Sequence, residues 1–442
     1  MKDLSGLADF LERKWFDRSG LAASVVASSI GSVTLLTSQS DAAWIRALVA
    51  LITAGAVFGV WLLSRRVPKA KRGRVGIVVT ISSENDEESQ RLRADFIEPL
   101  RKAIHNGVSG GSIHLIELPR FLTGKIVDKE SADAIRRKCR AHMVLYGRVR
   151  RRANGVDEFC HMELDGVVSH RPVPLETSLA FGNEFSELLP RGITIPAGQE
   201  FAGFTFTSGV TEIVSKYILG VAAGLSGDLQ YAESMFSEVQ ARVKTSTDKF
   251  PIFAKLAQRI PFRLSEIYEA KANIAYSQWR AEPTPERVAE LGNAVAAIGS
   301  LSIQRRESYY FFSAIHHFLY KRDIASALAS LSNVKNTGGI WNLNVAFLNA
   351  YKGNLKSAAR NYKSSAAKEV DIDTILQVED FLCRILEIEP QKVQLHYCLG
   401  LFNAHVKGDK ARAIQDFNFS WRTEPQQSSC RSGNCPKSGL KN

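Results

Sequence analysis

Basic residues gather between positions 136 and 152, where eight of seventeen residues are Lys or Arg. If residues 142–155 form a β-strand, alternate side chains share a face. Tyr146, Arg148, Arg150 and Arg152 then lie on one side of the strand. An aromatic ring beside three guanidinium groups could bind a phosphate-rich ligand such as a nucleotide or a nucleic acid. Two other interpretations stay open: a face exposed to solvent, and a surface that rests on a nearby membrane.

Other residue types that often carry chemistry lack the spacing it requires. His316 and His317 are adjacent, and adjacent helical positions point about 100° apart, so the pair does not form one metal-binding face. The six cysteines form no CxxC pair and no metal-ligand spacing. They are Cys139, Cys160, Cys383, Cys398, Cys430 and Cys435. No paired carboxylates or Ser/His/Asp order stand out, so the sequence predicts no catalytic residue, no metal, no cofactor and no enzyme activity.

Asparagine side chains recur in one helical stretch, at Asn342, Asn344 and Asn349. Their amides could hydrogen-bond the backbone of a bound peptide. The same three residues could also face solvent and contact nothing. The sequence therefore makes them candidates for a peptide-binding groove.

The basic strand belongs to a segment, residues 74–195, in which strand and helix patterns alternate. Strands are predicted at 74–83, 111–122, 142–155 and 157–170, and amphipathic helices at 84–107 and 128–141. Asn154-Gly155 is typical of a hairpin turn. The order βαβαββ predicts a small α/β domain, and residues 74–170 resemble the amino-terminal α/β domain of TolB-type proteins. That resemblance implies a fold and no activity.

Two runs without charge, within residues 19–40 and 45–64, precede this domain. Each is about as long as a bilayer-spanning helix, which needs about 20 apolar residues. Six Lys or Arg residues follow at 65–74, the lead-in 1–18 is amphipathic, and the connection between the runs has no Lys or Arg. The positive-inside rule then predicts a two-span protein of a plasma (inner) membrane of bacterial type, with both termini cytoplasmic and residues 65–74 against anionic lipid. A secretory signal peptide is the rival interpretation of the first run.

Small residues recur at helical spacing inside both runs. Ser24, Ser28 and Ser32 are four residues apart, and Gly55 and Gly59 form a GxxxG motif. Small faces let helix backbones approach closely. They predict packing of one span on the other, with a contact between copies of the chain as the alternative.

Residues 205–425 contain only helical patterns and repeat one arrangement. A turn is followed after four or five residues by Ala, and an aromatic residue or Leu follows four residues later. The recurring residues are Leu219, Gly220, Gly227, Ala232 and Phe236; Asp323, Ala327 and Leu331; Gly353, Ala358 and Tyr362; and Leu399, Gly400, Gly408, Ala413, Phe417 and Pro425. These residues resemble the tetratricopeptide repeat. The resemblance implies an all-α solenoid that binds peptides or partner proteins in a concave groove.

The net charge of +12 is concentrated at the two ends of the chain. Residues 1–74 contribute +6 and the tail 426–442 contributes +3, which leaves +3 for the rest. The folded body is therefore nearly neutral, which makes nucleic acid an unlikely partner, and the polar tail is predicted to be disordered. The sequence as a whole predicts a multi-domain membrane protein that serves as a cytoplasmic scaffold for a protein partner. A membrane-linked sensor that binds a nucleotide or nucleic acid through the arginine-rich strand is the alternative.

Overall fold

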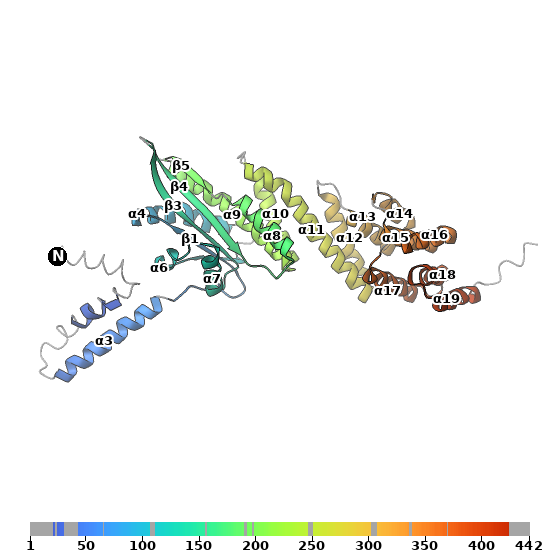
Figure 1. Ribbon diagram of the computed structural model, residues 1–442, viewed down its shortest axis with the longest axis horizontal. Coiled ribbons are helices and arrows are strands. Elements are labelled where there is room, and N and C mark those ends of the chain that lie inside the picture. Colours follow the sequence, from blue (N-terminus) through green and yellow to red (C-terminus); the bar gives the residue numbers. More distant parts are fainter. Residues whose placement is uncertain are drawn as a thin grey trace, which may run out of the picture. The chain divides into compact units, whose positions relative to one another are not determined.

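The computed structural model describes residues 21–22, 24–30, 43–64, 66–106, 111–154, 157–189, 192–196, 199–245, 251–301, 307–335, 338–368 and 370–423. The chain divides into two compact units, Met1–Thr247 and Asp248–Asn442. The described part is mostly helical, with one small sheet in the first unit (Figure 1).

The first unit combines five strands with helices. Its elements are α3 (Ala43–Ser64), β1 (Val75–Ser82), α4 (Asp86–Leu92), a π-helical turn η1 (Arg93–Ile97), α5 (Glu98–Asn106), β2 (Ile113–Glu117), α6 (Arg120–Thr123), α7 (Lys129–Cys139), β3 (Met143–Asn154), β4 (Asp157–Val168), α8 (Leu175–Leu188), β5 (Ile193–Pro196), α9 (Glu200–Leu225) and α10 (Leu229–Thr245).

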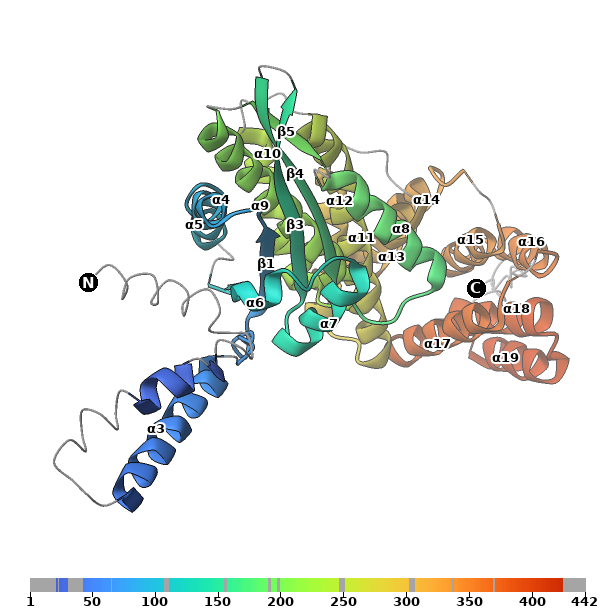
Figure 2. The same cartoon turned by 60° about the vertical axis from the view of Figure 1, so that its left-hand side comes forward.

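The strands form one sheet in the order β2-β1-β3-β4-β5. β1 runs parallel to both β2 and β3, whereas β3, β4 and β5 are antiparallel to their neighbours. The connection from β1 to β2 and the connection from β2 to β3 run in opposite directions across the sheet. Since crossovers are right-handed, the helices of the two connections must cover opposite faces. α5 of the first connection and α7 of the second accordingly lie on opposite sides of the sheet, and α9 packs against α5 (Figures 1 and 2).

The alternation of side chains in β3 assigns its residues to these two layers. Val144 and Tyr146 pack in one core with Ala132, Ile135 and Cys139 of α7. Buried residues of the opposite parity, Met143, Leu145 and Val149, point to the other face. Both faces of the strand are therefore used for packing along its first half.

The four strands and two helical segments that the sequence predicts for this domain are confirmed. β1, β2, β3 and β4 lie within the predicted segments, and helices occupy both predicted crossovers. The helix α8 and the short strand β5 were not predicted from the sequence. Phe185 of α8 lies where a Cβ on Gly166 of β4 would stand, at 2.5 Å, so this glycine allows the helix to approach the sheet.

The prediction of a two-span membrane protein is wrong. Among the described residues, no helix is both long enough and apolar enough to cross a bilayer. In the first run only residues 21–22 and 24–30 are described as helical, and nine of the 22 residues at 19–40 are Ser or Thr. The second run corresponds to α3, a helix of 22 residues that includes Arg46 and Thr53. The predicted inner-membrane location and the predicted two-span topology are wrong for the same reason.

The small residues of the two runs do not meet in the described part of the chain. Ser28 donates a hydrogen bond to the backbone of Ser24 within one helix, and Ser32 lies outside the described residues. A Cβ added to Gly55 or Gly59 would meet no described atom within 4 Å.

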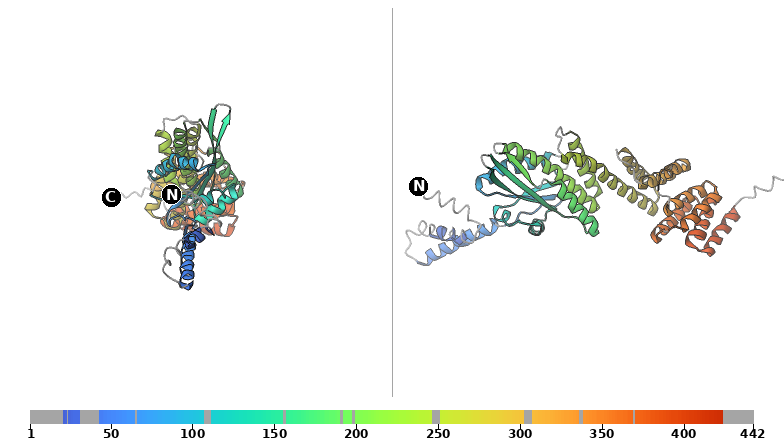
Figure 3. Two further views of the ribbon diagram at one scale, coloured as in Figure 1. Left: turned by 90° about the vertical axis from the view of Figure 1, so that its left-hand side faces the viewer. Right: turned by 45° about the horizontal axis from the view of Figure 1, so that its top comes forward.

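The second unit consists of helices. They are α11 (Pro251–Ala281), α12 (Pro285–Ser300), α13 (Glu307–Lys321), α14 (Ile324–Leu331), α15 (Gly339–Tyr351), α16 (Leu355–Ala366), α17 (Ile372–Ile388), α18 (Val393–Phe402), the π-helical turn η2 (Asn403–Lys407) and α19 (Lys410–Thr423). Figure 3 shows these helices from two further directions.

Four helix hairpins share one kind of turn: α9/α10 in the first unit, and α13/α14, α15/α16 and α18/α19 in the second. Each turn has a residue in the left-handed region, followed by an Asp or Asn. The four pairs are Gly227-Asp228, Arg322-Asp323, Gly353-Asn354 and Gly408-Asp409. In each, the Asp or Asn Oδ1 accepts a hydrogen bond of 3.0–3.3 Å from the backbone N–H three residues later. The turn therefore ends one helix and caps the next.

The Ala that follows each turn lies at the contact between helices. Ala232, Ala327, Ala358 and Ala413 are all buried. Four residues later come Phe236, Leu331, Tyr362 and Phe417. A Cβ on Gly220 would lie 2.9 Å from Phe236, and one on Gly400 would lie 2.5 Å from Phe417, so both glycines permit the first helix to contact the ring on the second. Buried Leu219 and Leu399 precede these glycines, and Pro425 lies outside the described residues.

Gly353→Ala is expected to destabilise the second unit by about 1 kcal/mol. Gly353 has φ +89, and a Cβ there would meet nothing within 4 Å, so the cost comes from backbone conformation alone. The measurement is the urea midpoint followed by circular dichroism, with Lys352→Ala as the control because Lys352 has φ −71. Equal midpoints for the two variants would contradict the prediction.

Candidate functional site

The predicted arginine stripe on β3 is matched by carboxylates on β4. The Tyr146 hydroxyl donates to Oδ2 of Asp165 at 3.3 Å. Arg148 Nε donates to Oε2 of Glu163 at 2.5 Å, and this hydrogen bond lowers the pKa of the Glu163 carboxyl. Both contacts follow from the β3–β4 register, which sets Tyr146 opposite Asp165 and Arg148 opposite Glu163. Tyr146 and Arg148, the first two residues of the stripe, are therefore already hydrogen-bonded to carboxylates of β4.

Arg150 and Arg152 continue the stripe toward the hairpin, where Arg150 is half-buried and Arg152 is exposed. A cleft of about 700 Å³, lined by Arg150 but not by Arg152, opens at the carboxyl end of β1. The charged residues that line this cleft are Arg148, Arg150 and Lys129, and Glu84, Asp128, Glu163 and Asp165. With four carboxylates against three cations, the cleft does not concentrate positive charge as a polyanion site would.

Arg151, which was not a candidate from the sequence, lies on the face of β3 opposite the arginine stripe. There it connects β3 with α4 and α9. Its guanidinium group lies 3.8 Å from Glu88 of α4 and 3.7 Å from Glu200 of α9. Both carboxylates are largely shielded from solvent, since their side chains are 6% and 21% exposed. Arg151 thereby neutralises two acids where the helices meet the sheet.

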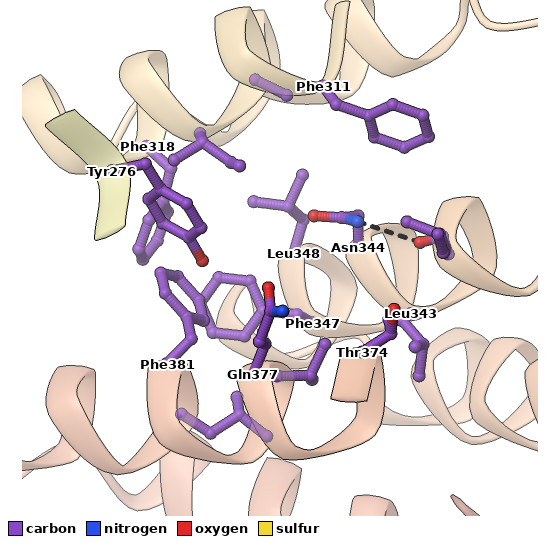
Figure 4. Close-up of a pocket in the computed structure, with 15 residues that line it drawn as sticks. Tyr276, Phe311, Phe318, Leu343, Asn344, Phe347, Leu348, Thr374, Gln377 and Phe381 are labelled. Carbon is purple, nitrogen blue, oxygen red and sulfur yellow. Dashed lines mark hydrogen bonds between the residues drawn. The ribbon is translucent and has the colours of Figure 1, made fainter. Parts of the chain in front are cut away.

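The three candidate asparagines on α15 differ in position. Each donates a hydrogen bond of 2.8–2.9 Å from its side-chain amide to the backbone carbonyl four residues earlier. Asn342 is buried and Asn349 also contacts Asn354, so both belong to the framework of the helix. Asn344 alone of the three lines a pocket, shown in Figure 4.

This pocket has a volume of about 210 Å³ and lies between α11, α13, α15 and α17. Its wall is mainly aromatic and aliphatic, and its polar residues are Tyr276, Asn344, Thr374 and Gln377. The apolar lining residues are Phe311, Ala314, Ile315, Phe318, Ile340, Leu343, Phe347, Leu348, Val378, Phe381 and Leu382. A concave, mostly apolar surface with a few polar groups is typical of a binding site.

Ring contacts hold one side of the pocket in place. The rings of Phe318 and Phe347 meet edge to face with centroids 4.9 Å apart. Phe381 of α17 packs against both, with centroids 6.2 Å and 5.1 Å away. Burial raises the pKa of the neighbouring Tyr276, so its hydroxyl stays protonated and can donate.

The mouth of the pocket carries polar groups on the first turns of α17. Asp371 is the N-cap residue and accepts hydrogen bonds from the backbone N–H of Thr374 at 2.8 Å and from its hydroxyl at 2.7 Å. The bond from the hydroxyl and then the bond from the N–H lower the pKa of Asp371, so the carboxylate stays ionised at neutral pH. Gln377 is exposed and follows Thr374 on the pocket side.

His316 and the buried cysteines of the described residues occupy structural positions, and Cys430 and Cys435 lie outside those residues. His316 packs where a Cβ on Gly292 would stand, at 2.5 Å, and stacks on Tyr320 with centroids 5.5 Å apart. In the described ranges no three His, Cys, Asp or Glu residues are grouped so that they could hold a metal ion. Burial raises the pKa of Cys139 to about 11 and of Cys398 to about 12, so these thiols are not nucleophiles at neutral pH.

Comparison with protein-family models, with curated proteins and with solved structures finds no match for this chain. The geometry of its own residues therefore carries the functional argument.

Proposed function

We propose that the helical unit binds a segment of a partner protein, and that a large apolar side chain of this segment fills the pocket between α11, α13, α15 and α17. The observation that carries the proposal is the aromatic pocket with polar residues at its mouth. The tetratricopeptide-like pattern supports it, because repeats of that family bind peptides. The proposal describes binding without a catalytic step.

The size of the pocket favours a side chain over a cofactor. Sites for drug-sized ligands and cofactors occupy about 300–1,000 Å³. A dry apolar cavity of about 150 Å³ is enough to bind benzene. At about 210 Å³, this pocket fits one large side chain. Asn344, Thr374 and Gln377 stand at the mouth, where their polar groups can bond the backbone of the same segment.

The alternative function, recognition of a nucleotide or nucleic acid by the arginine-rich strand, has less support. Glu163 and Asp165 face Arg148 and Tyr146, and the neighbouring cleft carries more acids than bases. A polyanion would have to displace or tolerate these carboxylates, which costs affinity. We therefore propose the protein-binding function alone.

Asn344→Trp is expected to weaken the binding of pocket-directed peptides about tenfold or more, because the indole fills the space that an anchor side chain would occupy. The test selects a displayed random-peptide library on the full chain and measures the dissociation constant of each enriched peptide for both proteins. Asn344 is half-buried, so the larger side chain can enter the pocket from its mouth.

Asn361→Trp is the matched control. Asn361 of α16 is also half-buried and makes the same bond to a carbonyl four residues earlier, at 2.9 Å, but does not line the pocket. It should leave binding within a factor of about two. If no peptide is enriched on the wild-type chain, or if both variants bind like wild type, the proposed function is wrong.

A further inference from the structure

One wall of the pocket is formed by an aromatic side chain of α17, Phe381. Phe381 projects from α17 toward rings that belong to α11, α13 and α15. Its centroid lies 5.1 Å from Phe347, 5.9 Å from Trp279, 6.2 Å from Phe318 and 6.3 Å from Tyr276. α17 thus shows how a segment with an aromatic anchor binds these helices (Figure 4).

The open space of the pocket lies where α17 presents side chains smaller than Phe381. Val378 and Thr374 lie about one and two turns before Phe381 on the same side of the helix, and both line the pocket. The opposite wall contains Phe318 and Phe347, the rings that also contact Phe381. The open part therefore continues an aromatic surface and has room for one further ring.

Two carboxylates accompany this open part. Asp371 lies within hydrogen-bond distance of the pocket residue Thr374. Asp373 is exposed and stands four residues before the pocket residue Gln377, so the two share a face of α17. Two full negative charges outweigh the positive end of the helix, which is equivalent to about half a charge. Two cations approach pocket rings in the described residues, and each is paired with a carboxylate. Arg280 lies over Tyr276 and 3.6 Å from Asp380. Arg322 lies over Phe318 and 2.6 Å from Glu389.

We propose that the partner segment inserts an aromatic side chain into the pocket and places a Lys or Arg beside it, against Asp371 and Asp373. This inference rests on the proposed function and specifies the partner. The aromatic ring provides most of the contact, since it fills the pocket. The basic residue selects among aromatic segments, because exposed charge pairs contribute little to affinity but disfavour like charge.

The experiment uses the same displayed random-peptide library on the full chain, with counter-selection on Asn344→Trp and on a second blocked variant, Thr374→Trp. Peptides lost on both variants should be enriched in Phe, Trp or Tyr with Lys or Arg within two positions. On the double variant Asp371→Asn/Asp373→Asn, the aromatic preference should persist while the basic preference disappears. Asn is also a good N-cap, so α17 should keep its start.

For one enriched peptide, the double variant should raise the dissociation constant about three- to tenfold at low salt, and less at high salt. The matched control is Asp409→Asn/Glu387→Gln, which removes two exposed carboxylates that do not line the pocket and should change binding less than twofold. Pocket-dependent peptides with aliphatic anchors or neighbouring acids would overturn this inference and leave the proposed function standing. If no peptide depends on the pocket, both are overturned.

Discussion

Lys216→Met is expected to lower the free energy of unfolding of the first unit by about 3–5 kcal/mol. Lys216 Nζ lies 2.6 Å from Oε1 of Glu212 on α9 and 3.0 Å from Oε2 of Glu238 on α10. The three side chains are 6%, 7% and 12% exposed. Removal of the cation leaves two carboxylates shielded from water and close to each other, which is the costly way to break a buried ion pair.

The rescue variant separates charge from packing. Glu212→Leu/Lys216→Met/Glu238→Leu replaces the whole triad with apolar side chains, and such replacement is often neutral or stabilising. Hydrogen exchange of α9 peptides in urea reports unfolding of this unit. We expect early exchange in the single variant and wild-type behaviour in the triple variant. If both are equally unstable, the loss of packing rather than the unpaired carboxylates is responsible.

The same triad makes the stability of the first unit depend on pH. Burial by itself lowers the pKa of Lys216, but the hydrogen bonds and charges of Glu212 and Glu238 outweigh it and raise the pKa above its usual 10.5. A group whose pKa is raised on folding contributes stability that is full below the unfolded pKa and is lost as the pH passes the folded pKa. The urea midpoint of the first unit should therefore fall above pH 10.5, and less so in the triple variant.

Local periodicity made most helices and strands predictable. The strand pattern of residues 142–155 identified β3, but the packing of Tyr146 against α7 was not predicted, because both faces of its first half are buried. β5 was not predicted because it has only four residues and pairs only with Phe159–Met162, in the first half of β4. Strands this short carry almost no periodic signal, so their existence depends on the neighbouring strand.

The membrane prediction relied on two runs without charge and on their basic flanks, but no described helix has the length and apolar character of a membrane span. The segment 19–40 has no charged residue, yet hydroxyl groups occupy nine of its positions. Each hydroxyl lowers the hydropathy on which insertion depends. The basic cluster at 65–74 then appeared to be a membrane flank. In the structure, the N–H of Ala70 instead donates to the carbonyl of Cys139 at 2.8 Å, so the segment packs beside the end of α7.

The pocket could be predicted only in part. Asn344 was a candidate from the sequence because of its residue type, and Asn342 and Asn349 were equally good candidates. What separates them is which helices pack against α15, and that depends on contacts between residues far apart in the chain. Phe311, Phe347 and Phe381 each look like ordinary core positions of separate amphipathic helices. The hairpin turns, in contrast, were visible in the sequence because their conformation is local.

Ala358→Trp is expected to destabilise the second unit by about 3 kcal/mol, the upper part of the usual range for an overpacked core. Ala358 is fully buried in the core that also contains Tyr362 and Phe402. α16 packs there against α15 and α18, so an indole has to push helices apart. Because α15 carries Asn344 and Phe347, peptide binding at the pocket should weaken together with stability.

Ala366→Trp is the matched control, because Ala366 is exposed at the end of the same helix. Its urea midpoint should stay close to that of the wild-type chain, whereas the midpoint of Ala358→Trp should fall. Ala358→Gly tests the opposite change: it removes volume without crowding, and should cost only about 1 kcal/mol through helix propensity. If Ala358→Trp keeps the wild-type midpoint, then α16 does not pack closely against its neighbours at this Ala. In that case the small residue after each turn has no steric role.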